Sequence, residues 1–177
     1  MSLLDPVVAV LRSHGISFAL AGASALAAHG VVRSTVDQDL FVMDSLCLDP
    51  SLWLSIRDQG ITVEVQKGDL FDPLAGVVRF ERSGERPLDV VVGKYTWQRE
   101  VLQRASVAPG TPETSIPLVR AADLILLKLY AGGPQDAWDI QQLLAGEDRE
   151  TLIAEVDREL PRLTSESAAL WKKILEG

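Results

Sequence analysis

The 177-residue chain contains no asparagine, a single cysteine and no long apolar run. The lone Cys47 cannot form a disulfide within the chain, and no cysteine and histidine have the spacing of a zinc site. No apolar stretch reaches the roughly 18 residues that a membrane-spanning helix needs. Depletion of amide residues is found in some heat-adapted proteins, and a GC-rich source would have the same effect. These absences exclude a disulfide framework and a zinc module, and we expect no membrane partner.

Basic residues are scarce where a secretory signal or a broad nucleic-acid surface would need them. The N-terminal stretch carries an acid, Asp5, where a signal would carry bases, so we expect a cytoplasmic location. The net charge of −8 argues against a broad phosphate-binding surface. Residues 136–177 hold ten acids and five bases, net −5, which leaves only −3 for the rest. We therefore expect any local basic patch to lie within residues 1–135.

What the chain does contain is 47% hydrophobic residues in alternating strand and helix patterns, enough for a continuous core. The patterns and stop signals predict helices at 6–14, 24–29, 50–59, 96–104, 119–130, 135–144, 150–160 and 165–175, and strands at 16–21, 35–43, 61–66, 76–82 and 87–92. The two strands on either side of Gly84 form a predicted hairpin, so the sheet is mixed. The expected fold is α/β (α+β), with a core over 1–117 and a helical subdomain over 118–177 packed on it.

The stretch 18–42 combines a glycine turn with two acids, and it is the part of the sequence that indicates a chemical function. Gly22, Ala23 and Ser24 lie between a predicted strand and helix, where backbone N–H groups and the Ser24 hydroxyl favour an anion such as phosphate. Asp37 and Asp39 alternate on the next strand and therefore share a face. Paired carboxylates bind hard divalent cations, Mg²⁺ above all. The alternatives are an exposed pair on a strand edge or a pair that caps a helix.

A two-metal arrangement needs a third carboxylate, for which Asp89 is the candidate. It is an isolated acid in the apolar strand 87–92, where a carboxylate without a partner is costly to bury. A structural ion pair with an arginine is the alternative. Glu64 is the rival acid, but its strand alternates and has a solvent face.

This pattern resembles the signature of minimal nucleotidyltransferases of the DNA polymerase beta superfamily, and within it the AbiEii-like abortive-infection branch. The residues that carry the likeness are Gly22-Ala23-Ser24-Ala25, His29-Gly30, Arg33, Thr35 and Asp37-Gln38-Asp39-Leu40. The resemblance implies a nucleotidyltransferase fold, two Mg²⁺ ions and an NTP substrate. It assigns Asp37 and Asp39 to the metal and Asp89 to activation of the acceptor hydroxyl. Many members of the branch are toxins, so it also implies an antitoxin partner.

The same resemblance extends to the nucleotide-binding residues and to the later helices. It implies that Gly22, Ala23, Ser24 and Arg33 contact the nucleotide, with Thr35 as a secondary residue; Arg33 could equally pair with Asp37. Ala23 stands where the family usually has a second glycine.

The branch also has a lysine on the helix after the core, followed by a Lys-Asp-x-x-Asp element. Lys128, Asp136 and Asp139 occupy those places, but Gln135 replaces the basic residue. Lys128 could contact phosphate or extend to the surface from a helix. Asp136 and Asp139 fit an ion-pair or capping role at least as well as a catalytic one.

Three functions compete. The first is an enzyme that moves a nucleoside monophosphate from an NTP to a hydroxyl of RNA, protein or a small molecule. The second is a haloacid-dehalogenase-like phosphatase, which the apolar residues after Asp39 make less suitable, because its Asp-x-Asp should end a strand. The third is a degenerate nucleotidyltransferase fold that binds nucleotide or a partner without turnover, consistent with Ala23 and Gln135.

Overall fold

The computed structural model describes residues 2–32, 37–107, 115–146 and 148–177. Helices are α1 (Leu4–Ser13), α2 (Gly22–Ala28), α3 (Leu54–Arg57), α4 (Thr96–Arg104), α5 (Ala121–Ala131), α6 (Pro134–Leu144), α7 (Arg149–Glu159) and α8 (Ser165–Glu176), with 3₁₀ turns η1 (Ser45–Leu48), η2 (Pro50–Trp53) and η3 (Leu160–Arg162). Strands are β1 (Phe18–Ala21), β2 (Gln38–Val42), β3 (Thr62–Lys67), β4 (Gly76–Glu81) and β5 (Leu88–Val92). Within these ranges no helix combines the length and the apolar character that crossing a bilayer requires.

The five strands form one mixed sheet in the order β1-β2-β5-β4-β3. Strands β2 and β5 are parallel, and the other neighbours are antiparallel. The predicted hairpin is the antiparallel β4–β5 pair. Because β2 and β5 run the same way side by side, residues at the start of each strand meet at one end of the sheet.

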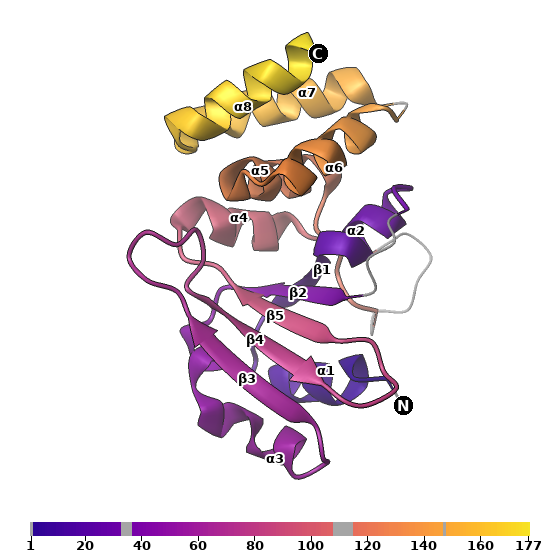
Figure 1. The fold of residues 1–177 in the computed structure, drawn as a ribbon, viewed down its shortest axis with the longest axis vertical. Helices are drawn as coiled ribbons and strands as arrows, with labels where there is room; N and C mark the ends of the chain where they lie inside the picture. The colour runs from indigo at the N-terminus through magenta and orange to yellow at the C-terminus, as the bar shows by residue number, and fades with distance from the viewer. Residues whose placement is uncertain (1, 33–36, 108–114, 147) are drawn as a thin grey trace.

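Two hydrophobic cores lie on opposite faces of this sheet. One face packs against α1 and the η1–α3 segment, through residues such as Val7, Trp53 and Phe80. The other packs against α2, α4 and α5, through residues such as Leu26 and Ile125. Figure 1 shows α1 and α3 at the sheet end of the molecule and α2 and α4 between the sheet and the later helices. Strand alternation thus divides β1, β2 and β5 between the two cores, whereas β3 and β4 contribute to the first core.

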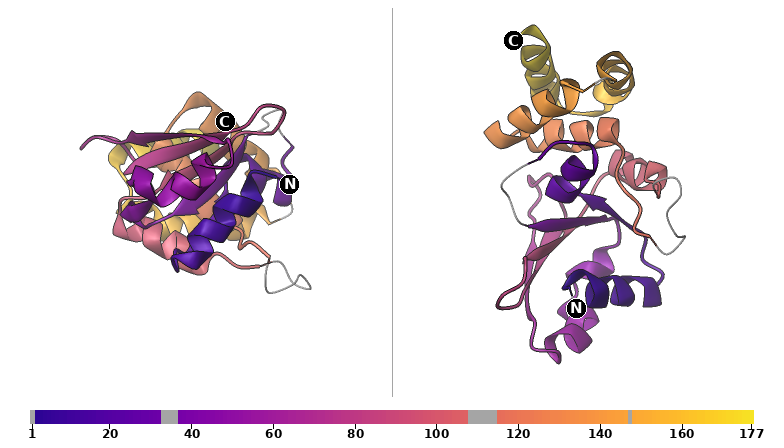
Figure 2. Two further views of the ribbon diagram at one scale, coloured as in Figure 1. Left: turned by 90° about the horizontal axis from the view of Figure 1, so that it is seen from below. Right: turned by 90° about the vertical axis from the view of Figure 1, so that its right-hand side faces the viewer.

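The helices after residue 120 gather at the far end of the molecule, as Figures 1 and 2 show. They share the second core with β1, α2 and α4. The chain enters them beside β1, where Leu20 N–H donates to Pro117 O at 2.7 Å and Val119 N–H donates to Leu20 O at 3.0 Å. The predicted helical part therefore packs on the sheet, while its division from the core at residue 117 stays a prediction.

Most predicted elements match the structure within a few residues. The helix predicted over 50–59 is present over 50–57, but its first turn is the 3₁₀ turn η2 and only the one-turn α3 is α-helical. A further 3₁₀ turn, η1, precedes it. Asp44 and Asp49 accept hydrogen bonds from the backbone N–H groups of Leu46 and Ser51, each at 2.9 Å. These side chains cap the starts of η1 and η2, so the two turns begin separately.

We expect Trp53→Ala to lower the free energy of unfolding by about 3–5 kcal/mol, as large-to-small core substitutions do. Trp53 is fully buried, and its ring packs edge-to-face against Phe80 with 4.9 Å between the ring centroids. It also donates its indole N–H to Cys47 O at 2.8 Å. Urea denaturation followed by circular dichroism measures the loss. Leu54→Ala is the matched control, because Leu54 is 56% exposed and should change stability by less than about 0.5 kcal/mol. Equal losses in the two variants would contradict this packing.

Candidate active site

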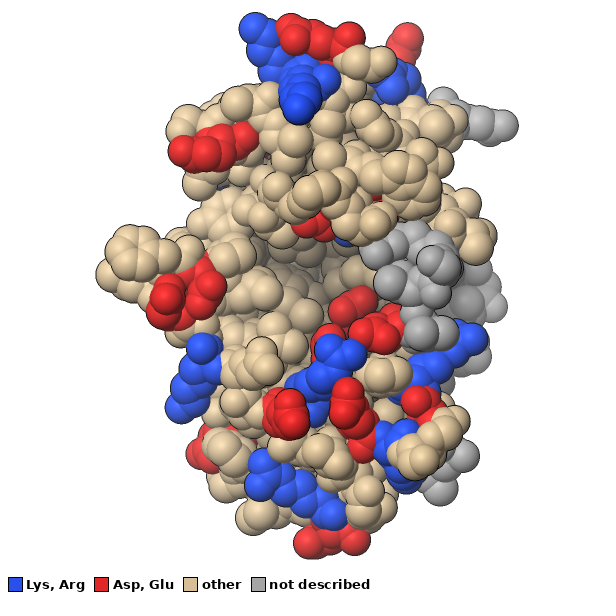
Figure 3. Space-filling model, in the orientation of Figure 1, with Lys and Arg blue, Asp and Glu red and all other residues tan. Residues whose placement is uncertain are grey.

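A row of charged residues crosses four neighbouring strands at one end of the sheet. In the register of the sheet, Asp39 on β2 lies opposite Asp89 on β5. Asp89 in turn lies opposite Arg79 on β4, and Arg79 lies opposite Glu64 on β3. Buried neighbours such as Leu40 and Val90 belong to the core on the opposite face, so alternation directs the row toward the face that α2 and α5 partly cover. Acidic and basic side chains lie intermixed on the sheet half of the molecule in Figure 3, next to a hollow below the C-terminal helices.

The Asp39 carboxylate lies directly against the glycine turn. Ala23 N–H donates to Asp39 Oδ2 at 3.2 Å. Gly22 has a φ of +49°, and a Cβ at this position would lie 2.0 Å from the same oxygen. Only glycine provides both this backbone conformation and this space. The turn and the carboxylate that the sequence analysis placed side by side are therefore in contact, and the contact resembles helix capping.

Arg79, on β4, bridges the carboxylates. Its Nη2 lies 2.7 Å from Asp37 Oδ2, its Nη1 3.5 Å from Asp89 Oδ2 and its Nε 3.0 Å from Glu81 Oε1. The hydrogen bond to Asp37, followed by the charge of Asp89, raises the pKa of the guanidinium. The alternative role for Asp89, an ion pair with an arginine, is thus partly present, although the distance between Arg79 Nη1 and Asp89 Oδ2 is long.

The Asp89 carboxylate is the most perturbed acid of the row. Burial raises the pKa of its carboxyl to about 6; Arg79 lowers it, while the negative charges of Asp39, Asp37 and Glu81 raise it further. Its Oδ1 is buried and accepts no hydrogen bond. A buried carboxylate oxygen without a donor is energetically unfavourable, which indicates that this oxygen serves a ligand or a proton.

The donor set of Asp37, Asp39 and Asp89 fits a hard cation, because all its atoms are carboxylate oxygens and one of them is buried and unpaired. As the side chains stand, however, no group of three acidic, histidine or cysteine side chains within the described ranges is gathered closely enough to hold a metal. The reason is visible in the contacts: Asp39 faces Ala23 N–H, while Asp37 and Asp89 face Arg79.

Lys128 is buried rather than exposed at the surface, so the surface-lysine alternative is wrong. Its ammonium lies 2.5 Å from Asp139 Oδ2 and 3.0 Å from Asp136 Oδ1. Asp136 also accepts from Gly133 N–H at 3.1 Å, and Gln135 Nε2 donates to Asp139 Oδ1 at 3.3 Å. The ion-pair and capping roles foreseen for the two acids are thus realised. Gln135 supports the cluster instead of adding a positive charge.

A pocket of about 230 Å³ joins the two halves of the site. Gly22 and Asp39 line it from the sheet side, and Lys128 and Asp136 line it from the helical side. Most of its remaining wall is apolar, contributed by Phe41, Pro73, Leu74, Val91, Leu124, Leu127 and Tyr130. The predicted phosphate turn, one metal-site acid and the later lysine therefore face one space.

Pro73 and Leu74 of the pocket wall belong to the segment 69–74 between β3 and β4, which is held by Lys94, just before α4, and by Gln98 of α4. Lys94 Nζ donates to the carbonyl oxygens of residues 69, 70 and 72 at 3.0–3.4 Å. Gln98, almost fully buried, donates to Pro73 O at 3.3 Å and accepts from the backbone N–H of Tyr95. The segment is thus held by side chains that no motif singled out.

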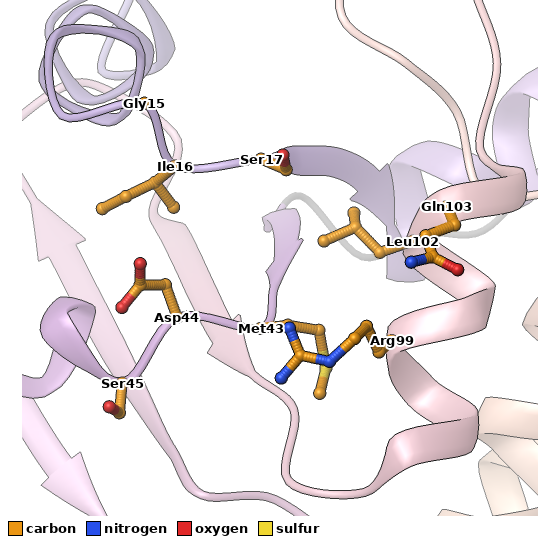
Figure 4. A pocket seen from close by; sticks show the side chains of 9 residues that line it. All are labelled: Gly15, Ile16, Ser17, Met43, Asp44, Ser45, Arg99, Leu102 and Gln103. Carbon is orange, nitrogen blue, oxygen red and sulfur yellow. The ribbon is translucent and has the colours of Figure 1, made fainter.

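A second pocket of about 450 Å³ lies at the opposite end of β2, between the α1–β1 connection and α4 (Figure 4). Its walls include Ser17, Met43, Asp44, Arg99 and Gln103. None of the predicted site residues lines it, although it is the larger of the two. Chemistry rather than size therefore identifies the candidate site.

The structure brings Gly22 and Ala23 into contact with Asp39 and pairs Asp39 with Asp89, whereas Asp37 is linked to Asp89 through Arg79; Ser24 is half-buried on the first turn of α2. Arg33 and Thr35 lie outside the described residues. The rival acid Glu64 is exposed, in agreement with its expected solvent face. Sequence reasoning missed Arg79, for which strand alternation at 76–82 was the available signal, since it places a cation on the side opposite Val78 and Phe80.

His29, which ends α2, has a structural role, because its Nε2 contacts Val119 O at 2.8 Å. The contact ties the helix that follows the glycine turn to the strand-like segment leading into α5. Helix α2 is thereby fixed at its C-terminal end, while Gly22 and Asp39 fix its beginning.

No protein-family model and no curated protein sequence matches the chain. Among solved structures, it is similar to the antibiotic-resistance factor ANT(2″)-Ia in solution, with a TM-score of 0.54 and 14% identity over 99% of this chain and 96% of that one. A crystal structure of ANT(2″)-Ia with adenylyl-2″-tobramycin gives the same score and identity, over 90% and 96%. Terminal uridylyl transferase 4 from Trypanosoma brucei matches with a TM-score of 0.36, a likeness too weak to define a fold. With its mixed sheet and flanking helices, the chain has a nucleotidyltransferase fold.

Proposed function

We propose that this protein transfers a nucleoside monophosphate from an NTP to a hydroxyl group of an acceptor. The observation that carries the proposal is the meeting of Asp39 with Asp89 across two parallel strands, beside the Gly22 turn. Three carboxylates next to a turn of backbone N–H groups suit a nucleotide's phosphates and their cations. The nucleotidyltransferase fold supports the same reaction class.

In this proposal Asp37, Asp39 and Asp89 hold Mg²⁺, with two ions as the expected number. The cation supplies charge neutralisation at the α-phosphate and at the leaving pyrophosphate. The acceptor oxygen forms a bond to the α-phosphorus while the bond between that phosphorus and the β-bridging oxygen breaks, releasing pyrophosphate. The proton of the acceptor hydroxyl passes to Asp89 Oδ1, which is buried and accepts no hydrogen bond, while Asp37 and Asp39 would retain the cation. Ser24 orients the phosphates through its hydroxyl and its backbone N–H, since Ala23 N–H donates to Asp39.

The acceptor that the observations favour is a small molecule. The ANT(2″)-Ia crystal structure holds a small molecule that carries an adenylyl group, and that protein covers 90% of this chain. The net charge of −8 disfavours a long nucleic acid. Lys128 and Asp136 line the far wall of the pocket, where they can position the nucleotide or the acceptor.

The second candidate is a degenerate nucleotidyltransferase fold that binds nucleotide or a partner protein without turnover. Two observations favour it: Lys128 is already paired with two acids, and Arg79 engages two of the three carboxylates. Release of pyrophosphate in the presence of Mg²⁺ and an acceptor separates the two candidates.

The AbiEii-like branch, a toxin activity, an antitoxin partner and a cytoplasmic location also remain proposals. The first three rest on the sequence pattern of 18–42. Co-expression with the product of a neighbouring gene, followed by growth measurement, tests the toxin and antitoxin parts together.

We expect Asp39→Asn to reduce pyrophosphate release about 100-fold or more, because the amide lacks the charge that a divalent cation needs. The assay measures pyrophosphate with Mg²⁺, each NTP and, as acceptors, tobramycin, RNA and a protein extract. Asp58→Asn is the control, since Asp58 is an exposed acid at the end of α3. No NTP consumption with any acceptor would contradict the enzyme proposal and favour the degenerate fold.

We expect Gly22→Ala to disrupt the candidate site in addition to straining the backbone. The added methyl group would collide with Asp39 Oδ2, whereas Gly30→Ala meets no atom within 4 Å at a similarly positive φ of +86°. Both variants carry a left-handed strain of about 1–2 kcal/mol, measurable by thermal unfolding. Only Gly22→Ala should also lose Mn²⁺ binding, detected by electron paramagnetic resonance. Equal Mn²⁺ affinities in the two variants would contradict the contact.

Metal affinity should fall at acidic pH, because a proton on Asp89 removes the negative charge of one of the three proposed ligands. Burial raises the pKa of this carboxyl to about 6, so it is increasingly protonated below pH 6. With one competing proton, Mn²⁺ affinity should drop about tenfold per pH unit below 6 and level off above 7. Titrations between pH 5 and 8 measure this. An affinity that is unchanged across that range would contradict the role of Asp89.

A further inference from the structure

Arg79 occupies the position of a cation among the carboxylates. Its guanidinium contacts one oxygen of Asp37 and one of Asp89, and its Nε contacts Glu81 from the same strand. Its side chain is one-third exposed, so it is neither a core residue nor freely solvated. An arginine fork with three acidic partners neutralises charge that would otherwise be self-repulsive.

The contacts of Arg79 use the same side chains that a divalent cation needs. Asp37 Oδ2 and Asp89 Oδ2 already have the guanidinium as a partner. A divalent cation bound by these oxygens would lie within a few ångströms of a positive charge, which is strongly unfavourable in a half-buried site. Cation and guanidinium therefore compete for Asp37 and Asp89.

We propose that Arg79 is a built-in counter-cation, which holds Asp37 and Asp89 in the metal-free protein and must release at least one of them when a divalent cation binds. The contact with Glu81 keeps the guanidinium at the edge of the site after release. Arg79 is thus a positioning residue that lowers the affinity for free cation and stabilises the metal-free site. This inference rests on the metal-binding role of the carboxylates in the proposed function.

The test compares Mn²⁺ affinity in wild type, Arg79→Met and Arg99→Met, without nucleotide, from the electron paramagnetic resonance signal of free Mn²⁺. Arg79→Met should bind Mn²⁺ at least about tenfold more tightly, because one positive charge has left the site. Arg99→Met controls for the change in net charge; Arg99 is exposed on α4 and lines the pocket at the other end of β2. Its affinity should match that of wild type.

Thermal unfolding supplies a readout that does not depend on activity. In EDTA, Arg79→Met should unfold at a lower temperature than wild type, because its carboxylates repel one another without a counter-charge. Mn²⁺ should raise its unfolding temperature more than that of wild type. Arg79→Lys keeps a charge without the fork, and should bind Mn²⁺ with an affinity between the two. It provides the comparison if Arg79→Met fails to fold.

Each outcome decides the inference. Tighter Mn²⁺ binding in Arg79→Met alone supports it. Equal affinities in wild type and Arg79→Met overturn it and leave the proposed function intact. Weaker binding in Arg79→Met also overturns it, since Arg79 would then organise the ligands. Absence of Mn²⁺ binding in both, at millimolar concentration, overturns the inference and the proposed function together.

Discussion

Repulsion between like charges is the constraint on which the arrangement of this site depends. The sheet register places Asp39 next to Asp89, with Asp37 and Glu81 close to the same guanidinium. Four carboxylates in so small a volume require compensation. The protein provides it from three sources: a backbone N–H for Asp39, Arg79 for the others, and burial that favours the protonated form of Asp89.

In the second charged cluster, a buried lysine rather than an arginine compensates the charge of two neighbouring carboxylates. Lys128, on the apolar helix α5, is buried between Asp136 and Asp139 of α6. Its charge is balanced within the helical part, so it contributes little net positive potential to the pocket. Asp39 of the first cluster and Lys128 and Asp136 of the second line the same pocket of about 230 Å³, whose remaining wall is mostly apolar. In the proposed function, the charge of a bound polyanion would therefore have to be balanced by cations that arrive with it.

Local pattern was sufficient for most of the fold. Gly15 and Gly132 end helices, alternation identifies β3, and Thr96–Arg104 forms the helix predicted there. The helix predicted over 50–59 is present over 50–57, with Asp49 capping its start, but its first turn is 3₁₀, a distinction that the apolar spacing does not make.

The site was harder to predict than the fold. The proximity of Asp39 to Gly22 followed from their places in strand and turn, but the pairing of Asp89 with Arg79 depends on strand order and register. A sequence shows which face of a strand a residue occupies, and not which strand lies beside it. Arg79 was therefore overlooked, and the pairing of Lys128 with Asp136 and Asp139 was not predicted, although an ion-pair role was one alternative for the two acids.

The shared volume of Gly22 and Asp39 has an evolutionary consequence. A side chain at position 22 and a carboxylate at position 39 exclude each other, because both would occupy the same few cubic ångströms. In a lineage that keeps the chemistry, neither position is free to change. Once the carboxylate is lost, the space argument for glycine disappears and only its backbone preference remains. Inactive descendants of this fold should therefore be recognisable by substitutions that arise at position 39 first and spread to position 22 afterwards.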